Sequence, residues 1–270
     1  MAKRKEEAVI YSQEKLAEGV YSLWIETSLV DSVHPGQFVG VYVNDKSKLL
    51  ARPISICDIK PDEKLLRMVY RVSGEGTDIL STYKKGDKIQ VLGVLGNGYE
   101  SALITTTGQT MNMNQILEGK KVIVVGGGIG IPPMLLAAKS LNCEKQIVLG
   151  YANSNMFLKD EFDAVGDVII STDDGSVGTK GTVIDAMKAN GVTGDVIFAC
   201  GPMPMLRGLK LYAKENNMQA YISLEERMAC GIGACLGCVC KTVNKDHHTH
   251  VNNTRICLEG PVFNSEVVDI

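Results

Sequence analysis

The chain has 270 residues, and its 28 Lys and Arg against 31 Asp and Glu give a formal net charge of −3. This balance argues against nucleic acid as the main partner, and a hydrophobic fraction of 45% with 22% charged residues is ordinary for a globular protein. The length is large for one compact core and predicts two or three domains.

We expect a cytoplasmic protein that does not associate with membranes. The start, Met1 to Glu7, lacks the apolar stretch of a signal peptide. The most apolar run, Val122 to Ala138, is interrupted by four glycines and two prolines and is not typical of a membrane span. Eight cysteines without a secretion signal indicate a reducing compartment, where thiolates hold metals more often than they form disulfides.

Residues 1–100 are predicted to form a small antiparallel β-barrel. Short β-rich runs occupy 37–43, 65–72 and 88–92, and turn signals that contain proline, glycine or aspartate separate them. The pattern changes near residue 101, so we expect the first domain to end there.

One tetrapeptide of this segment has the chemistry of a ligand site. Pro53 fixes its own φ and stiffens a strand end, so that Arg52 and Ser55 can face one ligand. Arginine suits a pyrophosphate, and a serine hydroxyl suits the edge of a flavin ring. A purely structural role is the alternative. The full run is Arg52-Pro53-Ile54-Ser55.

A second run in the same segment supports a ligand site. A strand that carries Val69-Tyr70-Arg71 leads to a Gly-x-Gly-Thr turn with Gly76 and Thr77. Such a turn can present bare backbone amides to a phosphate, and Tyr70 could stack on a ring.

Residues 101–220 are predicted to form an α/β domain with a parallel sheet. Lys121–Val125 is a short, continuously apolar strand of the kind buried in such sheets, and a glycine turn and a helical stretch to Leu141 follow it. Further strands are expected at 146–151, 167–170 and 195–199, with helices at 182–190 and 203–217.

Two loops of this domain indicate a dinucleotide site. Gly126, Gly128 and Gly130 follow the first strand and open a helix, where backbone amides attract phosphate and glycines let it approach. Cys200 ends the last parallel strand, where ligands sit in open α/β sheets; a buried structural cysteine is the alternative. No arginine suited to a 2′-phosphate follows Tyr151, which favours NAD over NADP.

The most informative residues are four cysteines near the end of the chain. Cys230, Cys235 and Cys238 have the spacing C-x₄-C-x₂-C, and Cys257 follows nineteen positions later. This is the plant-type spacing for a [2Fe–2S] cluster, in which four thiolates converge on two irons. Zinc sites usually pair cysteines as two knuckles, whereas Cys257 stands alone. Zinc and disulfides remain the alternatives.

The segment 221–270 is therefore expected to be a small [2Fe–2S] domain. Gly231, Gly233 and Gly237 permit the unusual φ angles of a tight loop, and their amides could point at the sulfurs and tune the potential. For Cys240 we favour packing over a ligand role. Three histidines precede the fourth cysteine, and we favour a solvated hairpin tip over a metal site for them: His247, His248 and His250.

Together these motifs resemble the ferredoxin-reductase superfamily. Arg52–Ser55 and Gly76–Thr77 match its FAD-binding barrel, in which the first motif contacts the flavin and the second contacts the diphosphate. The glycine loop that runs into Pro133 matches its nicotinamide domain. Cys200-Gly201-Pro202 resembles the element beside the nicotinamide, which implies a catalytic role for Cys200.

The cysteine segment points to one family. Leu224–Cys235 and Cys257–Phe263 closely resemble the electron-transfer subunits of class 1B dihydroorotate dehydrogenase. The resemblance implies FAD, a [2Fe–2S] cluster and NAD as substrate, in pyrimidine biosynthesis. It also implies an FMN-containing catalytic subunit as partner, in a heterotetramer of two of each subunit. One departure is Gly93-Val94-Leu95-Gly96, where family members usually carry Gly-Pro-Leu-Gly.

The implied path runs from dihydroorotate to the FMN of the partner, then through the cluster and FAD of this chain to NAD⁺. NAD⁺ accepts hydride and a cluster passes one electron at a time, so FAD, which can do both, must lie between them. Two alternatives stay open. One is the NAD(P)H reductase subunit of another complex, such as a ferredoxin-dependent transhydrogenase or a sulfite reductase. The other is a non-enzymatic zinc-binding scaffold.

Overall fold

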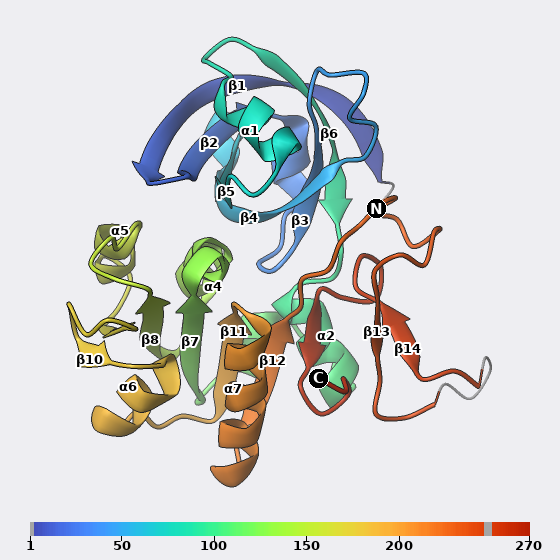
Figure 1. Ribbon diagram of the computed structural model, residues 1–270. Coiled ribbons are helices and arrows are strands. Elements are labelled where there is room, and N and C mark those ends of the chain that lie inside the picture. Colours follow the sequence, from blue (N-terminus) through green and yellow to red (C-terminus); the bar gives the residue numbers. More distant parts are fainter. Residues whose placement is uncertain (1–2, 246–249) are drawn as a thin grey trace.

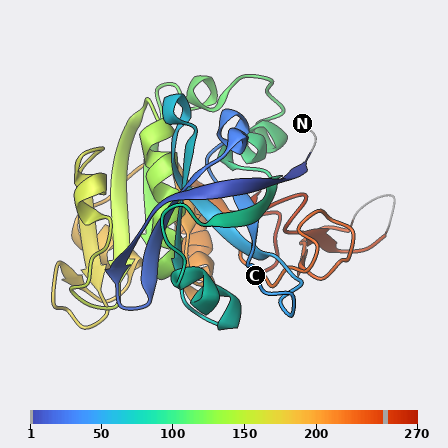
Figure 2. The same cartoon turned by 90° about the horizontal axis from the view of Figure 1, so that it is seen from above.

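The computed structural model describes residues 3–245 and 250–270, which form a β-barrel, a larger sheet with helices, and a small segment that carries the cysteines (Figure 1). In this view the barrel lies above the sheet, with helix α4 (Ile131–Ser140) between them. The cysteine segment lies beside both. Figure 2 shows it at the opposite side of the molecule from α5 and α6 (Lys159–Asp163 and Val183–Ala189).

Six antiparallel strands close the barrel in the order β1-β2-β5-β4-β3-β6, which confirms the predicted architecture. Along β6 alternate residues from Ile89 to Leu95 are buried, and Ile89 and Val91 pack in the barrel core. The turn expected before Thr77 is the start of a short helix, α1. The elements are β1 (Arg4–Ala17), β2 (Val20–Glu26), η1 (Ser28–Ser32), β3 (Phe38–Tyr42), β4 (Arg52–Lys60), η2 (Pro61–Glu63), β5 (Leu65–Arg71), α1 (Glu75–Ser81) and β6 (Lys88–Leu95).

The larger sheet has seven strands in the order β10-β9-β8-β7-β11-β12-β15. All its pairings are parallel except that of β15 with β12, which confirms the predicted α/β fold. Val122 to Val125 of β7 are fully buried, as expected for a strand covered on both faces. Besides α4, α5 and α6, the elements are α2 (Tyr99–Thr107), α3 (Met113–Ile116), β7 (Lys121–Gly127), η3 (Gly128–Gly130), β8 (Glu144–Tyr151), β9 (Val168–Thr172), β10 (Thr179–Lys180), β11 (Val196–Cys200), α7 (Met203–Glu215) and β12 (Gln219–Ser223).

The cysteine segment begins after β12 and has little regular structure. Its two short strands, β13 (Val239–Lys241) and β14 (Asn253–Arg255), pair as an antiparallel ribbon. The chain then returns to the large sheet, where β15 (Val262–Asn264) pairs with β12. The last strand of the sheet therefore comes from beyond the cysteines. Domain boundaries near residues 100 and 220 stay a prediction.

Two ion pairs connect the barrel to the α/β domain. Arg67 of β5 has a side chain only 6% exposed, and its Nη1 donates to both carboxylate oxygens of Glu161 in α5, at 2.6 and 2.9 Å. Its Nε donates to the hydroxyl of Ser22 at 2.9 Å. Lys139 of α4 pairs with the largely buried Asp58 of β4 at 2.5 Å. Because buried charges are costly without partners, these pairs favour one orientation of the barrel on the helices.

Throughout residues 3–245 and 250–270, every helix is too short or too polar to cross a membrane.

We predict that Arg67→Ala lowers the free energy of unfolding by about 2–3 kcal/mol, since it removes buried packing and leaves the Ser22 hydroxyl without its partner. Glu161→Gln should cost less than about 1 kcal/mol, because that carboxylate is more than a third exposed. Urea titration of both variants checks the order. Equal losses would show that Arg67 acts only through the ion pair.

Candidate redox site

The glycine loop and Cys200 meet where the order of the parallel strands reverses, between β7 and β11. Ligands of open α/β sheets bind at this kind of switch point. A Cβ at Gly130 would lie 2.4 Å from the backbone carbonyl carbon of Cys200, so only glycine lets the two loops touch. Gly128 has a φ of +54°, in the left-handed region that favours glycine. The structure thus brings two predicted nicotinamide motifs together.

Cys200 lies half-buried at the end of β11, with Gly126 of β7 on one side and Ser223 of β12 on the other. Burial raises the pKa of the Cys200 thiol to about 12, although the neighbouring Ser223 side chain acts in the opposite direction. The thiol is therefore neutral near pH 7. Sequence reasoning missed Ser223, because only the pairing of β11 with β12 places it beside the cysteine.

Arg52 and Gly76 also meet, although 24 positions separate them. A Cβ at Gly76 would lie 1.9 Å from Arg52 Nε, so the guanidinium lies directly over the start of α1. Arg52 Nη1 donates to the carbonyl of Leu50 at 2.7 Å. The Thr77 hydroxyl accepts from Ser73 N at 2.9 Å and donates to Gly74 O at 2.9 Å, so this side chain shapes the turn.

The other residues predicted for FAD lie on β4 and β5. Tyr70 is buried, its hydroxyl donates to Gln13 Oε1 at 2.9 Å, and its ring stacks on Tyr21 with centroids 5.9 Å apart. Tyr70 thus has protein partners for both its ring and its hydroxyl. Ile54 and Val69 are buried, Ser55 is half-buried, and Pro53 and Arg71 are exposed.

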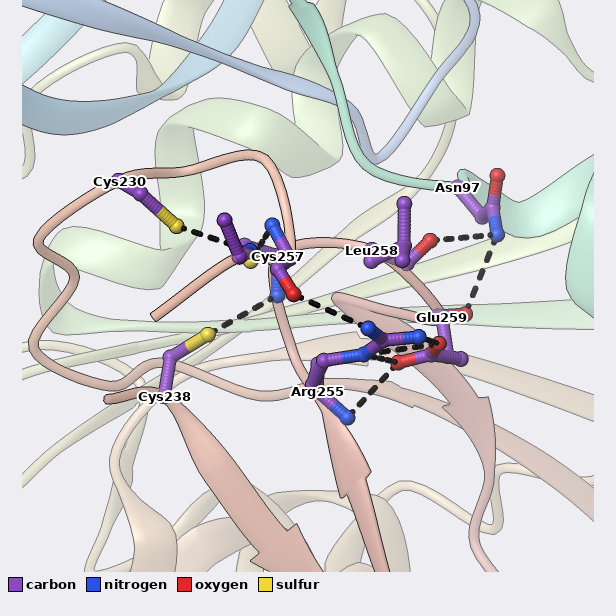
Figure 3. A network of polar contacts seen from close by, with 9 residues as sticks. Asn97, Cys230, Cys238, Arg255, Cys257, Leu258 and Glu259 are labelled. Atoms are coloured by element: carbon purple, nitrogen blue, oxygen red, sulfur yellow. Dashed lines mark hydrogen bonds and ion pairs between the residues drawn. The ribbon is translucent and has the colours of Figure 1, made fainter. Parts of the chain in front are cut away.

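Backbone N–H groups point at the sulfurs of all four predicted metal ligands, three of which are labelled in Figure 3: Cys230, Cys238 and Cys257. Two reach Cys230 Sγ, from Ile232 at 3.4 Å and from Ala234 at 3.3 Å. The Cys257 sulfur accepts from Gly233 N at 3.2 Å. The others are Gly237 N to Cys235 Sγ and Cys257 N to Cys238 Sγ, each at 3.4 Å. A cradle of donors of this kind suits thiolates in a cluster.

The four thiols are arranged as two pairs. Cys235 helps to lower the pKa of Cys230, and Cys238 helps to raise the pKa of Cys257, so the members of each pair lie close together. Across the described parts of the chain, no three His, Cys, Asp or Glu side chains gather as they would around a single metal ion. Two pairs fit the donor set of a two-iron cluster better than that of one zinc ion, which needs four ligands around one point.

The pKa values within the pairs differ for physical reasons. Burial opposes ionisation of Cys230, but the N–H groups of Ile232 and Ala234 and the contact with Cys235 outweigh it and lower the pKa of Cys230 to about 6. Burial and the neighbouring Cys238 raise the pKa of Cys257 to about 12. Metal binding deprotonates all such ligands, and the loop favours the thiolate at Cys230 more than at Cys257.

Cys240 lies in β13 and is half-buried among apolar side chains. Burial raises the pKa of its thiol to about 11, which suits a packed, uncharged cysteine. His250 is exposed. His247 and His248 lie outside the described residues.

The cysteine segment packs against the barrel. Met228, Cys230 and Gly231 close a narrow apolar recess whose other wall includes Gly40 and Pro53. Pro53 belongs to the run predicted to hold a flavin. Sequence reasoning gave no signal for this contact, because the two segments lie far apart in the chain.

Asn97, just after β6, fixes the end of the cysteine segment to the barrel. Its Nδ2 donates to Leu258 O at 3.0 Å and to Glu259 O at 3.3 Å (Figure 3), and its backbone N donates to Gly260 O at 2.6 Å.

A separate hollow of about 690 Å³ between His34, Glu100, Asn112 and Ser140 contains none of the predicted site residues.

Comparison with known proteins bears on the whole chain. Residues 225–269 match the sequence model of the iron-sulfur cluster binding domain of dihydroorotate dehydrogenase B. The dihydroorotate dehydrogenase B (NAD(+)) electron transfer subunit of Lysinibacillus sphaericus is 40% identical over 96% of each chain. The subunit of the same name from Fusobacterium nucleatum is 40% identical over 98% of each chain.

Solved structures agree on the fold. The NADH-dependent reduced ferredoxin-NADP oxidoreductase, described in work on flavin-based electron bifurcation, is 31% identical, with a TM-score of 0.83 over 97% of this chain and 89% of that chain. A ferredoxin NADP⁺ reductase from Neisseria gonorrhoeae with bound FAD and NADP is 14% identical. Its TM-score is 0.62 over 83% of this chain and 94% of that chain.

We predict that Cys240→Ser keeps iron near two per chain, as a two-iron cluster requires, because Cys240 packs outside the two thiol pairs. Cys257→Ser should lose the cluster while flavin stays bound, since its sulfur belongs to one pair. Iron analysis and EPR of the reduced proteins check both. An unchanged EPR signal in Cys257→Ser would contradict the ligand assignment.

Proposed function

The chain belongs to the family of dihydroorotate dehydrogenase B (NAD(+)) electron transfer subunits, and from this premise we propose that it carries electrons from the FMN of a catalytic subunit to NAD⁺. The route uses a [2Fe–2S] cluster and FAD, in pyrimidine biosynthesis. The observation that carries the proposal is that the Cys230 loop and Pro53 of the barrel line the same narrow apolar recess. The proposed cluster ligands therefore lie near the proposed flavin strand.

Three sets of residues would hold the groups concerned. A cluster passes single electrons, FAD exchanges one or two, and NAD takes up hydride, so the three together connect one-electron with two-electron chemistry. The pairs Cys230–Cys235 and Cys238–Cys257 would each hold one iron, and the backbone N–H groups would stabilise the negative charge on their sulfurs.

For FAD we assign Arg52–Ser55, Val69–Arg71 and Gly76–Thr77. The guanidinium of Arg52 would neutralise a diphosphate, and the missing side chain of Gly76 leaves the space that this guanidinium occupies. The half-buried Ser55 offers its hydroxyl to the flavin edge. The Thr77 hydroxyl keeps the backbone of the turn in shape.

For the nicotinamide nucleotide we assign Gly126, Gly128 and Gly130, with Cys200 beside the ring. A neutral thiol there contacts the ring without adding charge to the site, and it excludes water. Residues 152–155 after β8 are exposed and uncharged, which favours NAD over NADP. Hydride exchange with a flavin needs no general base from the chain.

The exposed side of the cysteine loop suits transfer to another protein. Cys235 is exposed, and the apolar side chains of Ile232 and Leu236 are 44% and 61% exposed next to it. We assign this side to the FMN-containing catalytic subunit, in a complex with two copies of each chain. Cytoplasmic location accords with the free cysteines of the described chain.

A second candidate is the NADP-reducing subunit of a ferredoxin-dependent complex. The observation that supports it is the 31% identity to the ferredoxin-NADP oxidoreductase. This identity is lower than the 40% identity to the dihydroorotate dehydrogenase subunits, so it remains the second candidate. Steady-state kinetics with NADH and NADPH separates the two, because a preference for NADPH would favour the second candidate.

We predict that Arg52→Ala lowers flavin affinity by roughly tenfold to a hundredfold, since a charge-assisted contact is worth about 1.5–3 kcal/mol. Lys60→Ala, at the opposite end of β4, is the matched control and should leave the affinity unchanged. Cys200→Ala should spare flavin content and slow NADH oxidation. Flavin titration and dye-linked assays measure these effects, and unchanged affinity in Arg52→Ala would exclude it as a flavin ligand.

The isolated chain should oxidise NADH with artificial acceptors but should not oxidise dihydroorotate. Adding the FMN subunit should confer reduction of NAD⁺ by dihydroorotate. Cys257→Ser should abolish that coupled activity and keep the NADH–dye activity, because only the former needs the cluster. Coupled activity that survives loss of the cluster would overturn the proposed route.

A further inference from the structure

Arg255 connects the two halves of the cysteine segment. It ends β14, two residues before Cys257, and its Nη1 donates to Gly233 O at 3.0 Å (Figure 3). Its Nε lies 3.1 Å from each carboxylate oxygen of Glu259, and its backbone N donates to Glu259 Oε2 at 2.8 Å. The loop that begins at Cys230 is thereby fastened to the segment around Cys257.

The carbonyl of Gly233 belongs to the same peptide group as the N–H of Ala234, which donates to Cys230 Sγ at 3.3 Å. The guanidinium of Arg255 therefore acts on one end of a peptide whose other end points at a sulfur. Hydrogen bonds in such a chain polarise one another and become stronger. The preceding N–H, that of Gly233, donates to Cys257 Sγ at 3.2 Å. Arg255 thus holds the residue whose two neighbouring N–H groups donate to two of the four sulfurs, those of Cys230 and Cys257.

The backbone conformation at Gly233 is closely constrained. Gly233 has a φ of +86°, and a Cβ there would lie 2.6 Å from Leu258 Cδ2. The backbone at this residue is held by packing on one side and by Arg255 on the other. Glu259 balances much of the charge of Arg255, although Arg255 also interacts electrostatically with Cys257 and Cys238. The test below therefore separates the effect of the charge from the effect through the peptide.

We propose that Arg255 is a positioning residue that raises the reduction potential of the cluster by orienting and polarising the Gly233–Ala234 peptide toward Cys230. The proposal rests on the proposed function, because it requires a cluster on the four cysteines. Reduction adds one electron and one negative charge without forming or breaking a bond. Stronger N–H donors stabilise that charge, and hydrogen bonds to the sulfurs are among the factors that set cluster potentials.

The test is an EPR-monitored redox titration of the full chain. Arg255→Met should favour the oxidised cluster by tenfold or more, which is a fall of about 59 mV or more for one electron. The double variant Arg255→Met/Glu259→Gln restores the net charge but not the bond to Gly233, so its potential should stay low. A wild-type potential in Arg255→Met or in the double variant would overturn the proposal.

Two further variants keep the test decisive. Arg227→Met is the matched control, because it removes the same charge from an exposed arginine three residues before Cys230. It should change the equilibrium constant for reduction of the cluster less than twofold. A shift in potential as large as that of Arg255→Met would overturn the proposal. If Arg255→Met fails to hold iron, Arg255→Lys keeps the charge without the planar fork. Its potential should still fall, and a wild-type value would overturn the proposal. Wild-type protein without iron would instead refute the proposed function.

Discussion

Asn97 makes the contacts on which the arrangement of the three parts depends. It lies just after the last barrel strand, and its backbone N and Nδ2 donate to the carbonyls of Gly260 and Leu258. Its own carbonyl accepts from Val262 N at 3.4 Å, where β15 begins. One residue therefore joins the barrel, the end of the cysteine segment and the edge of the large sheet. It thereby helps to position the Cys257 half of the cluster site relative to the barrel.

Glycines at points of close approach produce the proposed sites. Gly76 lies against the Arg52 guanidinium and Gly130 lies against the backbone of Cys200, in both cases closer than any Cβ allows. Gly233 packs in the same way against Leu258. Each contact joins segments that are distant in the sequence. A close contact made possible by a glycine therefore occurs in each of the three proposed sites: the FAD site, the nicotinamide site and the cluster site.

The sequence was sufficient for the fold class, because strand periodicity, turn residues and an apolar parallel strand are local signals. It also indicated the motifs around Arg52, Gly130 and Cys230, whose residue types have direct chemical meaning. It could not indicate Ser223, Asn97 or Arg255, because strand register and long-range contacts place them. The Gly-x-Gly-Thr segment was expected to be a turn that presents backbone amides to a phosphate. It is also the start of α1, and the Thr77 hydroxyl bonds to the turn itself.

The central claim is that flavin and cluster exchange electrons within this single chain, across the narrow recess lined by the Cys230 loop and Pro53. Rapid mixing of the isolated, oxidised protein with NADH, followed by freeze-quench EPR, tests it most directly. The account predicts that flavin absorbance bleaches first and that the signal of the reduced cluster then appears without any partner. Complete flavin reduction with a cluster that stays oxidised, although dithionite reduces it, would contradict the account.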